Sequence, residues 1–390
     1  MPEAMPKITL VGDTIDDSDV DRLIEWLETR PRLTKGEVTS EFEQRWAAAV
    51  GTKHAVFVNS GSSANLLMLY AMKVSGRLES NKVVVPAVAW ATDLSPLMQL
   101  GIEPVLADVN LRNLAVDVDH LERLFDEHRP SALLLVSVLG LPPDMEEIQA
   151  VCSQYGVTLL EDTCESLGSK YGDRLLGTFG SMSTYSLYFG HHLSTIEGGM
   201  VCTDDDELFA ALKMLRSHGW DRDLEADEQE SLRARWDVNG FEALYKFYLP
   251  GFNLRSTDLQ AYIGLGQLTR LETVVNRRYE NYRLYQRMLD PGLWRPTIAP
   301  EHLVSNFAFP LLHQKRENVV RLLRDHDVEV RPLICGSLGS QPFFVHRYGR
   351  VDLPNASKID RLGCYLPNHH LLGDEDVERV CELVNSVPTG

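Results

Sequence analysis

The stretch Ala132–Asp162 reads ALLLVSVLGLPPDMEEIQAVCSQYGVTLLED, and it begins and ends with short apolar runs. Turn residues or charges bound these two runs, Ala132–Leu139 and Val157–Asp162, and they also bound Lys82–Val88 and Pro104–Val109. Continuous apolar runs of this length are typical of strands that are buried on both faces of a mainly parallel sheet. The stretch therefore predicts a central sheet that is covered on both sides.

Helical patterns accompany these strands. The segments Ser62–Val74 and Glu207–Ser217 each place their apolar residues on one face of a helix. Ser183–Tyr188 and Gly199–Thr203 add two further strand-like runs. Because strands that alternate with helices pack as helix layers on both faces of a sheet, the pattern predicts a three-layer α/β domain.

The pattern changes near Thr257, where a long helical segment begins. Shorter strand-like and helical pieces follow it. We therefore predict a large α/β domain with its N-terminal segment over residues 1–256, a long connecting helix over 257–289 and a smaller α+β domain over 290–390. The highly charged stretch Asp221–Asp237 is expected to form an exposed loop or excursion.

Composition and charge argue against several classes of protein. The 390 residues include 38 Lys and Arg against 56 Asp and Glu, a formal net charge of -18, so a general binder of nucleic acid or anionic membranes is disfavoured. No apolar run is long enough to span a membrane and the start has no signal-like core, so we expect a cytoplasmic protein. None of the six cysteines forms a CxxC pair, which disfavours zinc and ferredoxin-type sites.

The segment Asn59–Asn65, NSGSSAN, leads directly into the predicted helix Ser62–Val74. Gly61 lets the backbone approach a ligand, the start of the helix exposes free N–H groups, and Ser62 and Ser63 add hydroxyl donors. The segment therefore indicates a phosphate site. A serine helix cap preceded by glycine explains the same residues.

Two further strand ends carry residues suited to a cofactor ring. Asp162 ends a buried run, where ligands of open α/β sheets gather, and such an aspartate can pair with a protonated ring nitrogen. Trp90 follows Lys82–Val88 and can stack on a flat ring. A helix cap for Asp162 and a core position for Trp90 are the alternatives.

The sharpest signal is Ser186–Gly199, SLYFGHHLSTIEGG, in which two adjacent histidines follow a strand and precede a Gly-Gly pair. A metal site would need more ligands at suitable spacing, and a surface pair is the other alternative. In Pro250–Leu259, PGFNLRSTDL, Asn253 and Arg255 can reach a phosphate or fix a loop before the next helix.

Together and in this order, these motifs resemble the DegT/DnrJ/StrS sugar aminotransferase family, whose members bind pyridoxal phosphate on the aspartate aminotransferase fold (fold type I). The resemblance runs from about Pro31 to Val384 and implies a three-layer αβα large domain with a smaller α+β C-terminal domain. It assigns the cofactor to Gly61, Ser62, Ser63, Trp90, Asp162, Glu165, Ser186 and Asn253.

The resemblance also implies how these residues act. Asp162 faces the pyridine nitrogen, Trp90 stacks on the ring and Glu165 supports the ring environment. Ser186, in GTFGSMSTYS, is a phosphate ligand, although the family pattern has Asp where this chain has Ser181. Asn253 reaches the phosphate of the neighbouring subunit, so the resemblance implies a homodimer with shared active sites.

One departure from the family pattern bears directly on function. Ordinary members carry the lysine that bonds to the cofactor in a pattern like SFxxxKNLxxxEGG, and the corresponding residue here is His191. An imidazole cannot form that bond, but it can move a proton near pH 7. Histidine at this position resembles the family's sugar 3-dehydratases, which implies a lyase with His191 as its acid and base.

That branch implies an enzyme of deoxysugar and O-antigen biosynthesis. It removes the C3 hydroxyl of a nucleotide-linked 4-keto-6-deoxyhexose, with GDP-4-keto-6-deoxy-D-mannose as the favoured substrate. It uses pyridoxamine phosphate that L-glutamate regenerates from pyridoxal phosphate. The unclustered cysteines imply no iron–sulfur cluster, and no metal is expected. The alternatives are the same chemistry on another nucleotide sugar or ketone, a sugar aminotransferase, and a non-catalytic relative.

Five further residues are substrate candidates by position only. Solvated or structural roles are equally open for them, and for His192 we favour packing or support behind the site. They are His192, His218, Arg222, Arg255 and Arg331.

Overall fold

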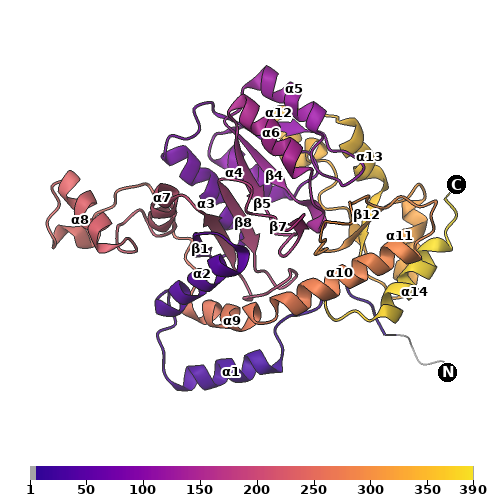
Figure 1. Ribbon diagram of the computed structural model, residues 1–390, viewed down its shortest axis with the longest axis horizontal. Helices are drawn as coiled ribbons and strands as arrows, with labels where there is room; N and C mark the ends of the chain where they lie inside the picture. Colours follow the sequence, from indigo (N-terminus) through magenta and orange to yellow (C-terminus); the bar gives the residue numbers. More distant parts are fainter. Residues whose placement is uncertain (1–5, 390) are drawn as a thin grey trace.

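A seven-stranded sheet lies at the centre of the computed structural model, which describes residues 6–389 (Figure 1). Its order is β1-β9-β8-β5-β4-β2-β3. Its strands are β1 (His54–Val58), β2 (Lys82–Pro86), β3 (Glu103–Ala107), β4 (Ala132–Val136), β5 (Thr158–Asp162), β8 (Met182–Ser186) and β9 (Gly199–Thr203). Only β9 runs against its neighbours, so the predicted mainly parallel sheet is confirmed.

Both faces of this sheet are buried. Along β4, Leu134 belongs to one hydrophobic core and its neighbours Leu133 and Leu135 belong to another, and all three are fully buried. Successive side chains of a strand point to opposite faces, so every position of β4 must be apolar. This explains why Ala132–Leu139 reads as a continuous apolar run.

Helices cover the sheet and connect its strands, as the alternating pattern predicts. They are α2 (Glu37–Val50), α3 (Gly61–Val74), α4 (Ala91–Gln99), α5 (Val118–His128), α6 (Met145–Tyr155) and α7 (Asp206–Arg216), with a 3-10 turn at η1 (Val138–Gly140). A hairpin of β6 (Lys170–Tyr171) and β7 (Arg174–Leu175) follows β5. Because β9 opposes both of its neighbours, β1 runs in the direction of β8, and the carboxyl ends of β1, β2, β5 and β8 share one edge.

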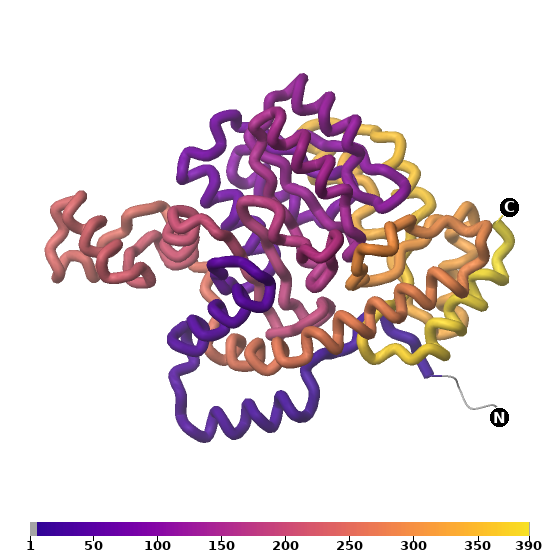
Figure 2. Tube along the Cα trace, in the orientation of Figure 1, coloured from indigo at the N-terminus to yellow at the C-terminus, as the bar shows by residue number. Residues whose placement is uncertain are grey.

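A smaller three-stranded sheet lies in the C-terminal part. Its order is β10-β12-β11, from β10 (Phe309–Leu312), β11 (Arg331–Pro332) and β12 (Gly363–Leu366). Around it are α11 (Arg316–Asp325), η3 (Leu338–Ser340), α12 (Pro342–Tyr348), α13 (Pro354–Leu362) and α14 (Asp374–Asn385). Ile8 pairs with Val328, so the N-terminal segment lies beside this part of the chain, although the sequence assigned it to the large domain (Figure 2). Residues 1–5 and 390 of the predicted domains lie outside the described residues.

The predicted single helix over 257–289 is wrong in one respect, because it is two helices. They are α9 (Asp258–Leu268) and α10 (Leu271–Met288). At the break, the N–H groups of Thr269 and Arg270 bond to carbonyls three residues back, and the Thr269 hydroxyl also bonds to Gly266 O at 2.7 Å. These tighter bonds end the regular α-helical ladder.

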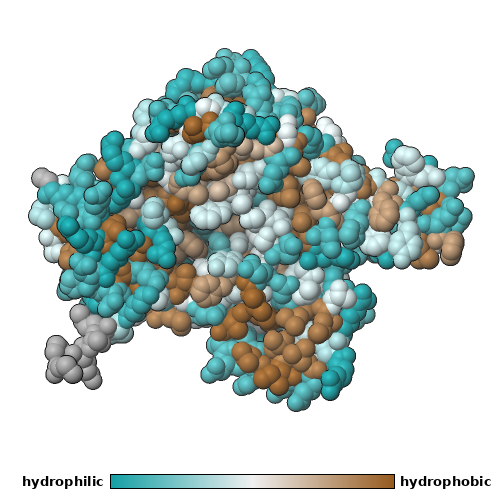
Figure 3. Space-filling model, turned by 180° about the vertical axis from the view of Figure 1, so that it is seen from behind, coloured by the Kyte–Doolittle hydropathy of each residue, from teal (hydrophilic) through white to brown (hydrophobic). Residues whose placement is uncertain are grey.

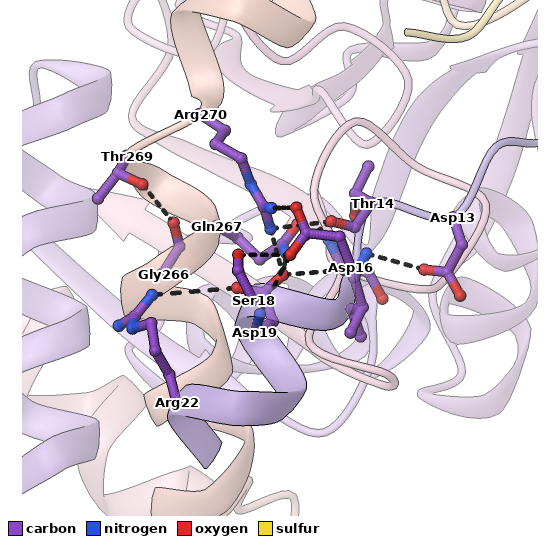
Figure 4. Close-up of polar contacts among 12 residues, drawn as sticks. Asp13, Thr14, Asp16, Ser18, Asp19, Arg22, Gly266, Gln267, Thr269 and Arg270 are labelled. Atoms are coloured by element: carbon purple, nitrogen blue, oxygen red, sulfur yellow. Dashed lines mark hydrogen bonds and ion pairs between the residues drawn. The ribbon is translucent and has the colours of Figure 1, made fainter. Parts of the chain in front are cut away.

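The break faces α1 (Asp17–Glu28), and a polar cluster joins the two (Figure 4). The Arg270 guanidinium pairs with Asp16 and Asp19 and donates to Thr14 O at 2.9 Å. Gln267 Nε2 donates to Asp19 at 2.7 Å. The cluster therefore fixes the otherwise projecting α1 against the α9–α10 junction.

Of the exposed loop or excursion expected for the charged stretch Asp221–Asp237, the structure has the excursion. It contains α8 (Ala226–Arg235), a helix with no buried residue that projects from the body of the molecule, and η2 (Glu242–Tyr245) follows it (Figure 1). Acidic residues in its first turn and arginines in its last complement the helix dipole and support it without a core. No helix in the described 6–389 range is long and apolar enough to cross a membrane.

Candidate active site

A cavity of about 420 Å³ opens at the edge where β1, β2, β5 and β8 end. Ligands of open α/β sheets bind at such an edge because the loops that follow the strands converge there. Residues on its wall include Ser60, Gly61, Ser62, Asn65, Trp90, Asp93, Asp162, Cys164, Glu165, Ser186, Tyr188, His191, Glu197, Phe307 and Tyr365. The cavity thus collects most of the residues that the motifs singled out.

One end of the cavity is built to hold an anion. The start of α3 points its free N–H groups there, and the Ser60 hydroxyl caps the helix by accepting from Ser63 N at 3.0 Å. A Cβ on Gly61 would lie 2.7 Å from Ser186 Cβ, so only glycine lets these two segments approach. Gly61, Ser62 and Ser186 line the cavity, whereas Ser63 does not.

Asp162, at the end of β5, is held rigidly at the floor of the cavity. Its Oδ1 accepts from Cys164 N at 2.8 Å and its Oδ2 accepts from Asn65 Nδ2 at 2.6 Å. The Asn65 oxygen in turn accepts from the Thr184 hydroxyl at 2.6 Å, which fixes which way the amide faces. The carboxylate is therefore oriented before any ligand arrives.

Trp90 is 54% exposed at the mouth of the cavity, so the alternative in which it is a core residue is wrong. It immediately precedes α4. Its backbone N–H donates to the Asp93 carboxylate at 2.8 Å, which ties the tryptophan backbone to the first turn of that helix. The indole is therefore available to cover a flat ring inside the cavity.

His191 lies in the loop after β8, where its backbone N–H donates to Tyr188 O at 2.9 Å. Its ring packs against that of Phe307, with the ring centroids 5.1 Å apart. Burial lowers the pKa of His191 to about 4, with a further lowering by Arg278, while Asp162 opposes the shift. The imidazole is therefore neutral near pH 7 and can accept a proton. The surface-pair alternative is wrong, because His191 lines the cavity and His192 is fully buried.

Sequence reasoning missed Asp93 and Asn65. Asp93 is fully buried, and burial together with the nearby Asp162 raises its pKa well above the ordinary value. Asn65 Nδ2 donates to both carboxylates, at 3.0 Å to Asp93 and 2.6 Å to Asp162. The only local signal was an acid three residues after Trp90, which is the pattern of a helix capping box and says nothing of the cavity.

Glu165, predicted to support the ring environment, lines the cavity. Its Oε2 accepts from Leu139 N at 2.8 Å. Burial raises the pKa of Glu165 to about 7, so this carboxyl can carry a proton near neutral pH. It adds a further titratable group to the cavity, beside Asp162, Asp93 and His191.

A family model described as the DegT/DnrJ/EryC1/StrS aminotransferase family matches residues 13–385, which is nearly the whole chain. The chain belongs to this family. The aminotransferase-type fold that the motifs implied is confirmed, with its mostly parallel central sheet covered by helices.

Among curated relatives of this family member is a GDP-4-keto-6-deoxy-D-mannose 3-dehydratase of Yersinia pseudotuberculosis, 30% identical over 98% of this chain and 100% of the relative. A dTDP-4-dehydro-2,6-dideoxy-D-glucose 3-dehydratase of Saccharopolyspora spinosa is 32% identical over 96% of this chain and 86% of the relative. A crystal structure of GDP-4-keto-6-deoxymannose-3-dehydratase with a trapped PLP-glutamate geminal diamine matches with a TM-score of 0.88 at 29% identity, covering 96% of this chain and 99% of that one.

The cavity of this DegT-family chain fits a phosphorylated pyridine. The fit rests on the Gly61–Ser186 contact that leaves the α3 amides open, on the fixed Asp162 carboxylate and on the exposed Trp90 ring. The α3 amides suit the phosphate, the Asp162 carboxylate suits a protonated ring nitrogen, and the Trp90 indole suits the flat ring face.

Several predicted residues lie outside this cavity. His192 is fully buried behind it, with Nε2 3.0 Å from Ser305 O, as expected if it packs rather than binds. Arg331 lies on β11 and is exposed. The other three candidates lie on the segments before and after α8. His218 packs edge-on against Trp220, and the Arg222 guanidinium lies 3.9 Å from the centre of the Trp220 ring. Arg255 Nε donates to Asn253 at 3.0 Å.

We expect three histidines of this DegT-family protein to lose their contribution to stability as pH falls from about 6.5 to 4, while Glu165 and Asp93, whose pKa values are raised, contribute in the opposite direction. Burial lowers the folded-state pKa of His191, His369 and His370 to about 4, so the unfolded chain binds more protons across this window. Their contribution is complete above about pH 6.5. Thermal unfolding between pH 7.5 and 4.5 measures the slope, which His369→Gln should flatten and His346→Gln, at an exposed position, should leave unchanged. The same slope in His369→Gln as in the wild type would contradict the expectation.

Proposed function

We propose that this chain is a nucleotide-sugar 3-dehydratase that uses pyridoxal and pyridoxamine phosphate. It removes the C3 hydroxyl of a 4-keto-6-deoxyhexose, with GDP-4-keto-6-deoxy-D-mannose as the favoured substrate. The observation that carries the proposal is His191, a neutral imidazole that shares one cavity with the fixed carboxylate of Asp162. At the position of His191, ordinary members of the family resemble one another in having a lysine.

The cofactor supplies a primary amine for the C4 ketone of the sugar and a ring that accepts electrons. The residues of the chain divide the remaining tasks. Gly61, Ser62 and Ser186 bind the phosphate, Asp162 keeps the proton on the ring nitrogen, and Trp90 covers the ring face. Because Asp162 is already oriented by Asn65 and the Cys164 amide, it binds the ring without rearranging.

His191 moves the protons. Its neutral ring accepts a proton from the carbon next to the cofactor amine, and the resulting imidazolium returns that proton to the departing C3 hydroxyl, which leaves as water. A lowered pKa suits this cycle, because the imidazolium is a strong acid once formed. Hydrolysis then releases the 3-deoxy sugar and ammonia, and L-glutamate restores the amine form of the cofactor.

The proposal includes no iron–sulfur cluster. The cysteines lie on separate parts of the fold, including Cys152 on α6, Cys202 on β9 and Cys381 on α14. Within residues 6–389 no group of three or more His, Cys, Asp or Glu residues is arranged to hold a metal ion. All six cysteines are unpaired, which suits the reducing cytoplasm that we propose as the place of the reaction.

We further propose a homodimer with shared sites. Asn253 is exposed and outside the cavity of its own chain, so it can reach a phosphate only in a neighbouring subunit. Large apolar side chains surround the cavity mouth and remain exposed, namely Trp90, Tyr188, Phe189 and Ile196. Val20 and Ile24 on α1 are also exposed, where the rear view shows a large apolar area (Figure 3). Such area is typical of an interface.

The substrate candidates near α8 belong to the same proposal. Arg222 and Arg255 line a second pocket with Arg32 and Lys35, which also holds Glu37, Glu41 and Asp223. In a dimer with shared sites, the arginines of this pocket supply donors for the diphosphate of the nucleotide sugar. His218, at the base of the projecting arm, is placed to assist.

Mass spectrometry of the product tests this function. Purified protein, pyridoxal phosphate and L-glutamate are mixed with GDP-, CDP- and dTDP-linked 4-keto-6-deoxysugars. A sugar one oxygen atom lighter, formed with ammonia and 2-oxoglutarate, is the expected product and identifies the nucleotide. An amino sugar would instead make the chain a sugar aminotransferase, and cofactor binding with no change in any sugar would point to another ketone or a non-catalytic role.

A further inference from the structure

Arg278, on the inner face of α10, is 1% exposed, yet no carboxylate lies within 4.0 Å of it in the described chain. Its donors meet backbone carbonyls instead. Nη1 donates to Phe307 O at 2.8 Å, to Asn306 O at 3.3 Å and to Asn368 O, and Nη2 donates to His191 O at 3.4 Å. One buried cation therefore joins two segments beside the small sheet to the loop that carries His191.

This arrangement is unlike that of the other fully buried arginine. Arg216 pairs with Glu43 and Asp223, so its charge is neutralised by acids. An unpaired cation inside a protein loses its hydration without the compensation of an opposite charge. The four carbonyls accept from Nη1 and Nη2, whereas the buried Nε has no partner in the described chain. A net positive charge is left beside the cavity, and burial lowers the pKa of Arg278 to about 9.

We propose that Arg278 is a positioning residue for His191, fixing its backbone to the small-sheet region and directing an unpaired positive charge at its imidazole. This inference rests on the function proposed above for His191. It assigns to Arg278 no contact with substrate or cofactor.

The positioning part follows from two contacts that converge on one residue. Arg278 holds the carbonyl of His191, and it also holds the carbonyl of Phe307, whose ring packs against the His191 imidazole. The same guanidinium therefore positions both the backbone and the ring of the histidine. Lysine, a point charge without a planar fork, cannot reproduce these bonds.

The electrostatic part follows from the charges that face His191. Asp162 on β5 raises the pKa of His191 and Arg278 on α10 lowers it, while burial lowers it most. Glu165 and Asp93 line the same cavity. The cation also lowers the pKa values of three further histidines, the buried His192 and His369 and the half-buried His370. Removing the charge is therefore expected to raise the pKa of His191 and to leave less neutral imidazole at a given pH.

Two substitutions separate geometry from charge in the holoenzyme. Arg278→Lys keeps a cation and loses the fork, so kcat should fall about tenfold or more with KM and the acidic limb of the pH–rate profile unchanged. Arg278→Met removes the cation, so the acidic limb should also move up by about half a pH unit or more. Arg277→Met is the matched control on the same helix, because Arg277 pairs with Asp374 on the outer side, and it should change neither quantity.

The His191 ring titration, followed by NMR of histidine-labelled holoenzyme and assigned with His191→Gln, gives a second measurement that needs no turnover. An unshifted His191 titration in Arg278→Met overturns the electrostatic part. If that variant does not fold, as judged by its melting temperature, Arg278→Lys still decides, because full kcat in it overturns the positioning part. Failure of the proposed function is distinct: the wild-type holoenzyme would then form no 3-deoxy sugar, or His191→Gln would keep full dehydratase turnover.

Discussion

Replacing His191 by lysine is expected to lower dehydration about a thousandfold, the effect of removing a general acid and base. The lysine amine would bond to pyridoxal phosphate, which shows as a change in cofactor absorbance and as a mass increase after borohydride reduction. A covalent bond would also hold the cofactor in place of the free amine form that condenses with the sugar. Single-turnover assays with pyridoxamine phosphate and the nucleotide sugar measure the chemical step.

His191→Gln is the matched control for this substitution. Glutamine neither bonds to the cofactor nor moves a proton, so turnover should fall by a similar factor while the cofactor absorbance stays that of the wild type. If either variant kept full dehydratase turnover, His191 would lose its assigned role. A variant that gained transaminase activity would be consistent with it.

Asp162→Asn is expected to lower turnover by two to three orders of magnitude, because asparagine cannot stabilise a protonated ring nitrogen as a carboxylate does. The spectrum of bound pyridoxal phosphate should then become pH-dependent near neutrality, as the ring nitrogen loses its proton. Absorbance titration of the holoenzyme reports this directly. The amide retains the size of the carboxyl, so the cavity itself should stay intact.

Glu161, the residue before Asp162, provides the control. Its carboxylate accepts from the backbone N–H groups of Gly177, Phe179 and Gly180. Glu161→Gln should therefore lower the melting temperature without changing the titration of the ring nitrogen. If Asp162→Asn behaved in the same way as this control, Asp162 would be a structural residue and not the partner of the ring.

The sequence alone predicted the central sheet and most of the candidate site. Continuous apolar runs predicted β2, β3, β4 and β5 because strands buried on two faces have no polar side. Gly61, Trp90, Asp162, Ser186 and His191 stand in local motifs, and the carboxyl ends of neighbouring strands bring them to one cavity. Local sequence is sufficient there, since each residue is placed by the strand that precedes it.

Other features depend on partners far along the chain. The predicted helix over 257–289 breaks at Thr269. Next to the break, Arg270 faces α1 and pairs with Asp16, which is 254 residues away in the sequence. Asp93 is the second buried acid of the site only because Asn65 and Asp162 meet it there. Arg278 reads as one more arginine of an amphipathic helix until the carbonyls of His191, Phe307 and Asn368 surround it. Sequence therefore determined which groups carry the chemistry, whereas tertiary packing decided their charge and orientation, because burial and long-range hydrogen bonds set both.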